Sequence, residues 1–341
     1  MRKYYIDYLR VVAIIAVITI HVTVYYFNKF NEISRIDWWM ANLLNSASRF
    51  SVPLFIMASG AVLLGKSVNI GDFYKKRAIR LLPAIIFWNM FYLGFSLYKG
   101  MELSNLIWML KVGLFASGKA AGHLWYLPMF SCLMLFVPFI NKWLIGDKPS
   151  SDDLRSLYYV FFFFFFLNGI SSIAYNTLEI KIVWFKIFPW FIAYFIGGYY
   201  IDKYGNNFSI SNTKILSAII FLIFTGSIIN YFFAHHYGIL KDNLVLGSVS
   251  PFIFIIAFLI FLFAKVNSHR FKESKTISRV SEASFGMYLI HPVFIYFLRN
   301  VLSSYNLSAS VNIFLTIILT ALVSFFFIMA LRKFSFMKII C

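Results

Sequence analysis

Charged residues are scarce in this chain. Only 13% of its 341 residues are charged, whereas 61% are hydrophobic, with 42 phenylalanines alone. A soluble globular domain is closer to a quarter charged and half apolar. The composition therefore excludes a soluble α/β enzyme, and it equally excludes a disordered chain. It also overrides the expectation of about two domains that the length alone would give.

Cysteine is nearly absent as well. The chain has two cysteines, Cys132 inside an apolar stretch and Cys341 at its end. Two such positions make no disulfide framework, and no CxxC motif or Cys/His cluster points to a metal site. We also find no internal repeat and no long linker, and we expect no metal.

Long apolar runs make up most of the sequence. A transmembrane helix needs about 20 mainly apolar residues. The first run ends at Phe27 and lacks a small-residue cleavage site, so we interpret it as a retained helix rather than a signal peptide. The others lie near 41–64, 81–98, 122–140, 156–173, 186–201, 214–233, 250–265, 283–299 and 310–331. The sequence thus predicts an all-α integral membrane protein of about ten transmembrane helices, a single domain over residues 1–341 with no soluble domain.

The basic residues indicate the orientation in the membrane. A net charge of +18 could indicate nucleic-acid binding, but with Met1 placed inside, 21 of the 31 lysines and arginines fall on inner segments and nine on outer ones. Arg49 lies within a span. Positive residues concentrate on cytoplasmic loops. We therefore predict that both termini are cytoplasmic, that the protein has a lipid environment, and that it has no nucleic-acid partner.

Ionisable residues inside a span are costly and are functional candidates by default. Arg10 and His21 are 11 residues apart, which returns them to within about 20° of one helix face, about 16 Å apart along the axis. Asp7 precedes Arg10 by three residues and can pair with it. Histidine is the most suitable general base near neutral pH. An inner salt bridge plus a histidine satisfied by a neighbouring helix fits these residues equally well.

A second group lies before the third span. Arg77 and Arg80 share a helix face, and Pro83 then breaks or kinks the entry to the span. Ordinary positive-inside anchoring explains such a run. A phosphate clamp explains it as well, because the planar arginine fork donates two hydrogen bonds to a phosphate.

Two further residues stand inside spans. Arg49 belongs to a segment rich in Asn and Ser that is too polar to face lipid, so it must face protein or water. A polar helix–helix seam is the alternative to a functional role. His291 lies in mid-span before Pro292, where a structural role is as good an explanation as a functional one.

Aromatic residues gather near the predicted outer ends of the spans. Tyr25, Tyr26, Trp38 and Trp39 are among them, and we interpret most of the group as an interfacial belt. For His123, on the outer side at the start of the fourth span, a simple interfacial position is one interpretation. We expect His235, His236 and His269 to be solvated.

Five stretches in this order resemble the membrane acyltransferase-3 family over nearly the whole chain. They are Asp7-x-x-Arg10-x10-His21, Val52-Pro53-Leu54-Phe55-x-x-x-Ser59-Gly60, Arg77-x-x-Arg80-x-x-Pro83, His123-Leu124-Trp125-Tyr126-Leu127 and Tyr288-Leu289-Ile290-His291. The chain is similar to the short stand-alone branch typified by the O-acetyltransferase of enterobacterial common antigen, without the extracytoplasmic esterase-like domain of longer members.

The resemblance implies a bacterial multi-pass protein of the cytoplasmic membrane that transfers an acetyl group from acetyl-CoA to a hydroxyl of a cell-surface or lipid-linked glycan. It implies that Arg10 and His21 are catalytic and that Arg77, Arg80 and Arg10 contact coenzyme A. Asp7, Arg49, Trp125 and His291 are expected to line the cavity. His21 would act either as general base or as an acyl relay.

Other functions and details stay open at this stage. A transporter or flippase of a glycan precursor or small acid also suits ten spans with intramembrane arginine and histidine, although such proteins often show internal repeats. A structural subunit of a polysaccharide synthase is a third possibility. The sequence does not distinguish one acceptor sugar from another, acetyl from another short acyl group, or one oligomeric state from another.

Overall fold

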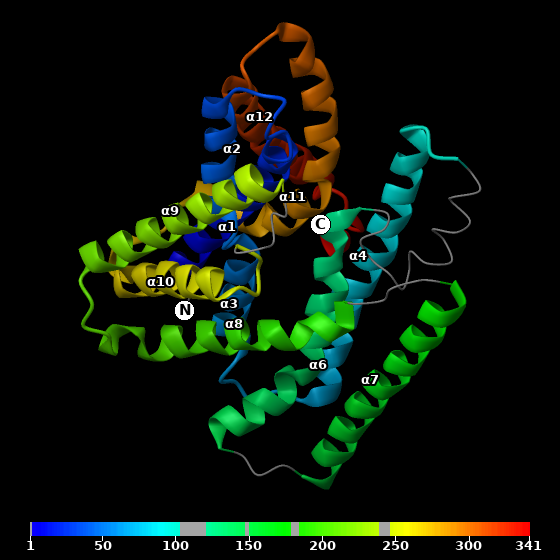
Figure 1. The fold of residues 1–341 in the computed structure, drawn as a ribbon. Helices are drawn as coiled ribbons and strands as arrows, with labels where there is room; N and C mark the ends of the chain where they lie inside the picture. The colour runs from blue at the N-terminus through cyan, green and yellow to red at the C-terminus, as the bar shows by residue number, and fades with distance from the viewer. Residues whose placement is uncertain (1, 103–120, 147–149, 179–183, 239–245) are drawn as a thin grey trace. The chain divides into compact units, whose positions relative to one another are not determined.

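The computed structural model describes residues 2–102, 121–146, 150–178, 184–238 and 246–341, and within these ranges the chain is helical with no strand. The main helices are α1 (Tyr4–Phe27), α2 (Arg35–Ser48), α3 (Ser51–Leu63), α4 (Ile70–Tyr98), α6 (Tyr126–Ile145), α7 (Ser151–Leu178), α8 (Trp184–Tyr204), α9 (Asn212–Tyr237), α10 (Pro251–Val266), α11 (Lys275–Leu302), α12 (Ala309–Leu331) and α13 (Met337–Ile340) (Figure 1).

Each of the ten predicted apolar segments coincides with a helix. The second is divided into α2 and α3, which are separated at Arg49 and Phe50. Seven helical stretches among the described residues are long and apolar enough to cross a membrane, and α10 is a shorter apolar helix. The prediction of an all-α membrane protein is confirmed. The number of ten spans and the sides of the termini stay predictions.

The predicted break at Pro83 is wrong. Helix α4 begins at Ile70, where the Asn69 side chain accepts a hydrogen bond from the backbone N–H of Asp72 at 3.0 Å, and it continues through Pro83 to Tyr98. Proline removes one backbone hydrogen bond. The long helix-forming segments on both sides retain theirs, so the run of basic residues at 75–80 and the apolar span after Pro83 lie on one continuous helix.

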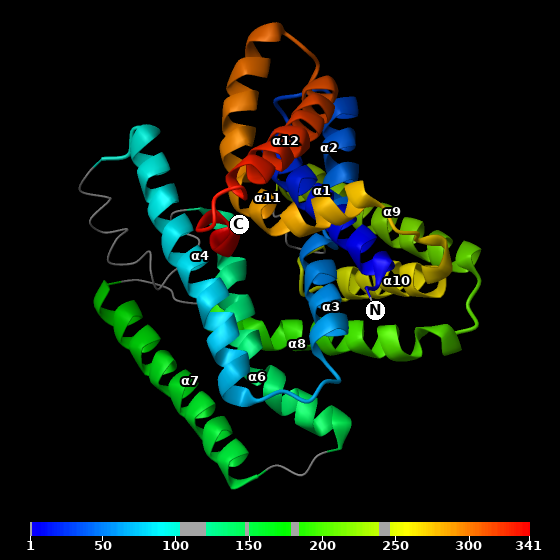
Figure 2. The ribbon, with the colours of Figure 1, turned by 180° about the vertical axis from the view of Figure 1, so that it is seen from behind.

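The chain divides into two compact units. Unit 1 comprises Met1–Val62, Tyr194–Lys333 and Cys341, and unit 2 comprises Leu63–Ala193 with Phe334–Ile340. In unit 1, α1 packs against α2, α11 and α12, and α9 packs against α2 and α10 (Figures 1 and 2). In unit 2, α4 packs against α6 and α13.

Two glycines let α3 and α8 approach closely within unit 1. A Cβ atom added at Gly198 would lie 2.0 Å from the Met57 carbonyl oxygen, and one added at Gly60 would lie 1.8 Å from the Phe195 carbonyl oxygen. Small residues allow such backbone contact between membrane helices. The Ser59-Gly60 sequence of the family-like motif therefore has a packing reason at Gly60.

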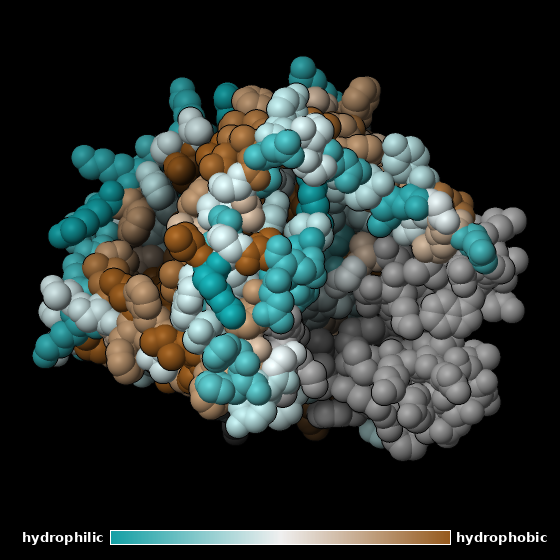
Figure 3. Space-filling view, turned by 45° about the horizontal axis from the view of Figure 1, so that its top comes forward, coloured by the Kyte–Doolittle hydropathy of each residue, from teal (hydrophilic) through white to brown (hydrophobic). Residues whose placement is uncertain are grey.

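Some aromatic residues near the predicted outer end of α1 are buried. Trp38 is fully buried with Phe27 and Phe30, and its indole N–H donates to the Phe27 carbonyl at 2.9 Å. Trp38 therefore anchors α2 on α1, and its place in the interfacial belt stays a prediction. Elsewhere large apolar side chains do reach the surface, such as Phe221 on α9 and Phe326 on α12, and Figure 3 shows apolar surface beside hydrophilic residues.

Candidate active site along helices α1 and α11

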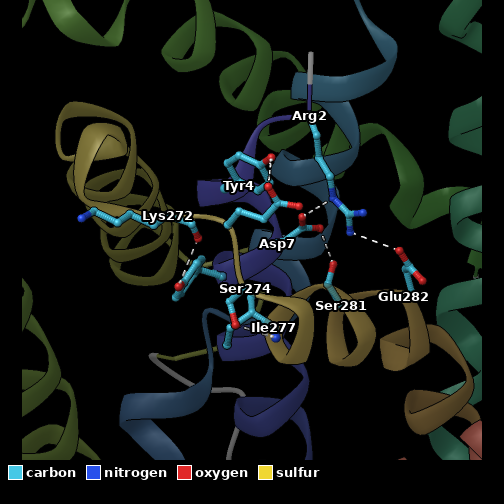
Figure 4. A network of polar contacts seen from close by, with 10 residues as sticks. Arg2, Tyr4, Asp7, Lys272, Ser274, Ile277, Ser281 and Glu282 are labelled. Carbon is cyan, nitrogen blue, oxygen red and sulfur yellow. Dashed lines mark hydrogen bonds and ion pairs between the residues drawn. The ribbon is translucent and has the colours of Figure 1, made fainter.

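Asp7 fixes the start of α1 against α11. Its carboxylate is buried and accepts two hydrogen bonds, from Arg2 Nε at 2.7 Å and from Ser281 Oγ at 2.7 Å (Figure 4). Arg2 also donates to Glu282 at 3.2 Å. The hydrogen bond to Asp7 raises the pKa of Arg2. The predicted pairing of Asp7 with Arg10 stays a prediction.

A second carboxylate holds the same end of α1. Asp202, at the end of α8, accepts a hydrogen bond from Tyr5 OH at 2.6 Å and pairs with Lys3, and Lys265 of α10 lies 3.9 Å away. The N-terminus of α1 is thus tied to α8 and α10 as well as to α11. These contacts fix the register of α1 in unit 1.

His21 and His291 lie side by side across the α1–α11 seam. Their ring centroids are 4.9 Å apart and the rings are tilted by 51°. His291 is fully buried, and His21 is half-buried. Since Asp7 also contacts α11, the face of α1 that the periodicity assigns to Asp7, Arg10 and His21 is the face that packs on α11. Arg10, half-buried, lies between the other two along this helix.

The backbone fixes the proton position on His291. Its Nδ1 lies 2.7 Å from the carbonyl oxygen of Tyr288, and a carbonyl can only accept a hydrogen bond. Nδ1 must therefore carry a proton, and in the neutral ring Nε2 is the basic nitrogen. The structure thus places a second imidazole of defined tautomer next to His21.

Beyond the histidines, Tyr25 and Arg299 meet across the same seam. The Arg299 guanidinium carbon lies 4.1 Å from the centroid of the Tyr25 ring. The sequence alone does not predict this contact. In the sequence, Tyr25 follows His21 by four residues and Arg299 follows His291 by eight. These spacings predict a contact only when α1 and α11 are already known to be neighbours.

Arg49 is buried in a polar seam between helices. Its Nε donates to Asn45 Oδ1 at 2.8 Å, and Asn45 Nδ2 donates to Thr23 Oγ1 at 3.0 Å. One turn earlier, Asn42 Nδ2 donates to the Ser227 carbonyl of α9 at 2.9 Å. The prediction that this polar segment faces protein or water is confirmed. Its asparagines form polar contacts with α1 and α9. A role of Arg49 in lining the cavity stays a prediction.

Arg77 and Arg80 lie in unit 2 on α4. Arg77 is half-buried with its guanidinium 5.0 Å from the Phe73 ring centroid, and Arg80 is exposed. Within the described ranges neither has an ion pair with a carboxylate, and the buried Nε of Arg77 has no hydrogen-bond partner there. Two adjacent arginines without carboxylate partners are suited to bind an anion.

Trp125 also belongs to unit 2, in a short 3-10 turn (Gly122–Trp125). Its ring centroid is 5.7 Å from that of Phe191 at an interplanar angle of 35°. His123 in the same turn is buried, with its ring edge-on to Tyr92 at 5.0 Å. The turn thus encloses His123 in protein, and its position at the membrane interface stays a prediction.

The predicted site residues fall into two groups. Unit 1 contains the predicted residues of α1, of α11 and of the C-terminal end of α2, namely Asp7, Arg10, His21, His291 and Arg49, and it brings His21 and His291 into contact. Unit 2 carries Arg77, Arg80 and Trp125. Each unit is described by itself, so the arrangement of a phosphate clamp beneath His21 stays a prediction.

One comparison with known proteins finds a match. A family model described as an acyltransferase domain matches residues 3–331, which covers most of each unit and includes every predicted site residue. No curated protein and no solved structure matches the chain.

Proposed function

The chain belongs to the membrane acyltransferase-3 family, and we propose that it transfers an acetyl or other short acyl group from cytoplasmic acyl-CoA to a hydroxyl of a surface or lipid-linked glycan. We also propose that it works in the bacterial cytoplasmic membrane. The observation that carries the proposal is the contact between His21 and His291 on two packed membrane helices, at 4.9 Å between ring centroids. Ionisable side chains inside a membrane span are costly and mark functional sites. A histidine pair there supplies a base that works near neutral pH.

The arginines of α4 suit the donor. Coenzyme A carries several phosphates. Among the described residues, the guanidinium groups of Arg77 and Arg80 form no ion pair with a carboxylate. Arg10, on the first helix, would add a third cation below His21. His21 lies about 16 Å from Arg10 along α1, so a phosphate held at Arg10 would leave room for the thin pantetheine arm to reach toward His21.

In the proposed reaction the oxygen of the acceptor hydroxyl bonds to the acyl carbon, and His21 accepts the proton of that hydroxyl. The carbon–sulfur bond breaks, and the CoA sulfur leaves with its electron pair and takes up a proton. His291, with Nδ1 held by Tyr288, would keep the ring of His21 in place. In the relay version His21 itself takes the acyl group and passes it to the hydroxyl, with the same net balance.

Purified protein with labelled acetyl-CoA tests the proposal, with CoA release and acetyl transfer to isolated membranes as readouts. We expect the wild type to be active, His21→Ala to lose transfer, and His236→Ala to keep it. His236 is exposed near the end of α9 and contacts Phe232 rather than the seam. Full transfer by His21→Ala would remove the role given to His21.

Mass spectrometry of the surface glycans, with and without the gene, tests the reaction in cells. We expect deletion to remove acyl esters while the polymer is still exported. Lost export with unchanged esters would instead support a transporter.

A further inference from the structure

The α1–α11 seam carries cations on both sides of the histidine pair. Arg10 lies toward the predicted inner end, whereas Arg299 meets Tyr25 beyond the histidines, toward the predicted outer end. Tyr25 is one helical turn from His21, or about 6 Å along the axis. An acceptor bound at Tyr25 and Arg299 would thus be separated from His21 by no more than about the length of one sugar ring.

Arg299 has no carboxylate partner among the residues that the structure describes, although it is half-buried. Other cations of unit 1 do have one, such as Lys29 with Glu32 at 2.9 Å. A shielded arginine is costly in a membrane. The face of the Tyr25 ring offsets only part of this cost.

The surroundings of Tyr25 are positive. Lys29 Nζ lies 4.8 Å from the centroid of the same ring that Arg299 contacts. Since Glu32 neutralises Lys29, the charge of Arg299 is left uncompensated. Such a site attracts an anion and repels a cation.

We propose that Tyr25 and Arg299 form the acceptor site and that the acceptor glycan is anionic. The Arg299 guanidinium binds a phosphate or carboxylate of the glycan, and the adjacent sugar ring lies on the exposed side of Tyr25 with a hydroxyl directed to His21. The planar fork of arginine fits both oxyanions. This inference rests on the proposed function and specifies its substrate class.

The first experiment compares variants in membranes that contain the native acceptor. We expect Arg299→Gln to lower acetyl transfer about tenfold or more, which corresponds to about 1.4 kcal/mol. Arg299→Lys should keep part of the activity, because it retains the charge without the fork. Arg35→Gln is the matched control, since Arg35 is also an outer arginine 4.1 Å from an aromatic ring centroid, that of Phe30, but it belongs to α2.

CoA release without acceptor separates the two proposals. Without acceptor, water takes the place of the hydroxyl and releases CoA slowly; if the wild type releases no CoA even when acceptor membranes are added, the proposed function fails. If Arg299→Gln loses CoA release along with transfer, or transfers as well as Arg35→Gln, the acceptor site is overturned. Lost transfer with CoA release retained supports it and also shows that the variant is folded.

Competition identifies the anion. Glucose 1-phosphate, glucuronate and glucose share a sugar ring and differ in charge, so each is added to wild-type membranes. Inhibition by the phosphate alone indicates a phosphate-linked acceptor, and inhibition by glucuronate indicates an acidic sugar. Both effects should disappear in Arg299→Gln. Equal inhibition by all three, or by none, would overturn an anionic acceptor.

Discussion

The imidazoles of His21 and His291 are in contact, with ring centroids 4.9 Å apart on α1 and α11. Two imidazoles at this distance repel each other strongly when both are charged, so a proton on one ring disfavours a second proton on the other. The proton on His291 Nδ1 is held by the Tyr288 carbonyl at 2.7 Å. A change in either histidine should therefore affect the protonation of the other.

Replacing His291 should affect turnover more than donor binding. We expect His291→Leu to lower kcat about tenfold to a hundredfold, less than the about 10²–10⁴-fold loss for His21→Ala, with the KM for acetyl-CoA nearly unchanged. His291→Asn keeps a donor for the Tyr288 carbonyl and should recover part of the loss. The acid limb of the pH–rate profile should shift in His291→Leu, because one member of the coupled pair is gone. An unshifted profile with a raised KM would contradict this.

Helical periodicity placed Asp7 and His21 on one face of α1, and both contact α11, because residues 3.6 apart repeat on one face whatever the helix packs against. It could not identify α11 as the partner, since contact between helices distant in sequence depends on tertiary packing. The Tyr25–Arg299 contact was missed for the same reason. The error at Pro83 has another cause, because a proline-induced break depends on how well the flanking turns are held.

Gly198 should be intolerant of a side chain that Gly197 accepts. A Cβ at Gly198 would lie 2.0 Å from the Met57 carbonyl, whereas one at Gly197 meets nothing within 4 Å. Since backbone cannot move aside like a flexible side chain, Gly198→Ala must push α3 and α8 apart, at a cost of about 1–3 kcal/mol. We expect its unfolding temperature in detergent to fall. Gly197→Ala should be neutral or stabilising, because alanine favours a helix, and equal behaviour of the two variants would argue against this helix contact.

Arg49 can be assigned to the seam or to the cavity by comparing two variants. Arg49→Ala leaves Asn45 Oδ1 without its 2.8 Å hydrogen bond, and Asn45→Ala removes the same bond while keeping the cation. Both should lose about 1–3 kcal/mol of stability, measured by thermal unfolding in detergent. If Arg49 also lines the cavity, Arg49→Ala will lose acetyl transfer and Asn45→Ala will keep most of it. Equal transfer would restrict Arg49 to the seam.

Asp153 should make the α6–α7 connection sensitive to acid. Hydrogen bonds from Lys142 and then Ser150 lower the pKa of Asp153 to about 2. Because the folded pKa lies below the ordinary value of about 3.9, this carboxylate stabilises the fold above pH 4, and the stabilisation is lost as pH falls toward 2. Between pH 4 and 2 the unfolding temperature of the wild type should therefore fall more steeply than that of Asp153→Asn.

Asp152→Asn is the matched control for Asp153→Asn. Its carboxylate is exposed and lies 3.6 Å from Arg155, and such surface pairs contribute about 0–1 kcal/mol. We expect this variant to follow the wild type across the whole pH range, whereas Asp153→Asn should already be less stable at pH 7, where Lys142 has lost its anionic partner. If the two asparagine variants give the same profile, the Lys142–Asp153 pair does not stabilise the connection, and the acid sensitivity must come from other carboxylates.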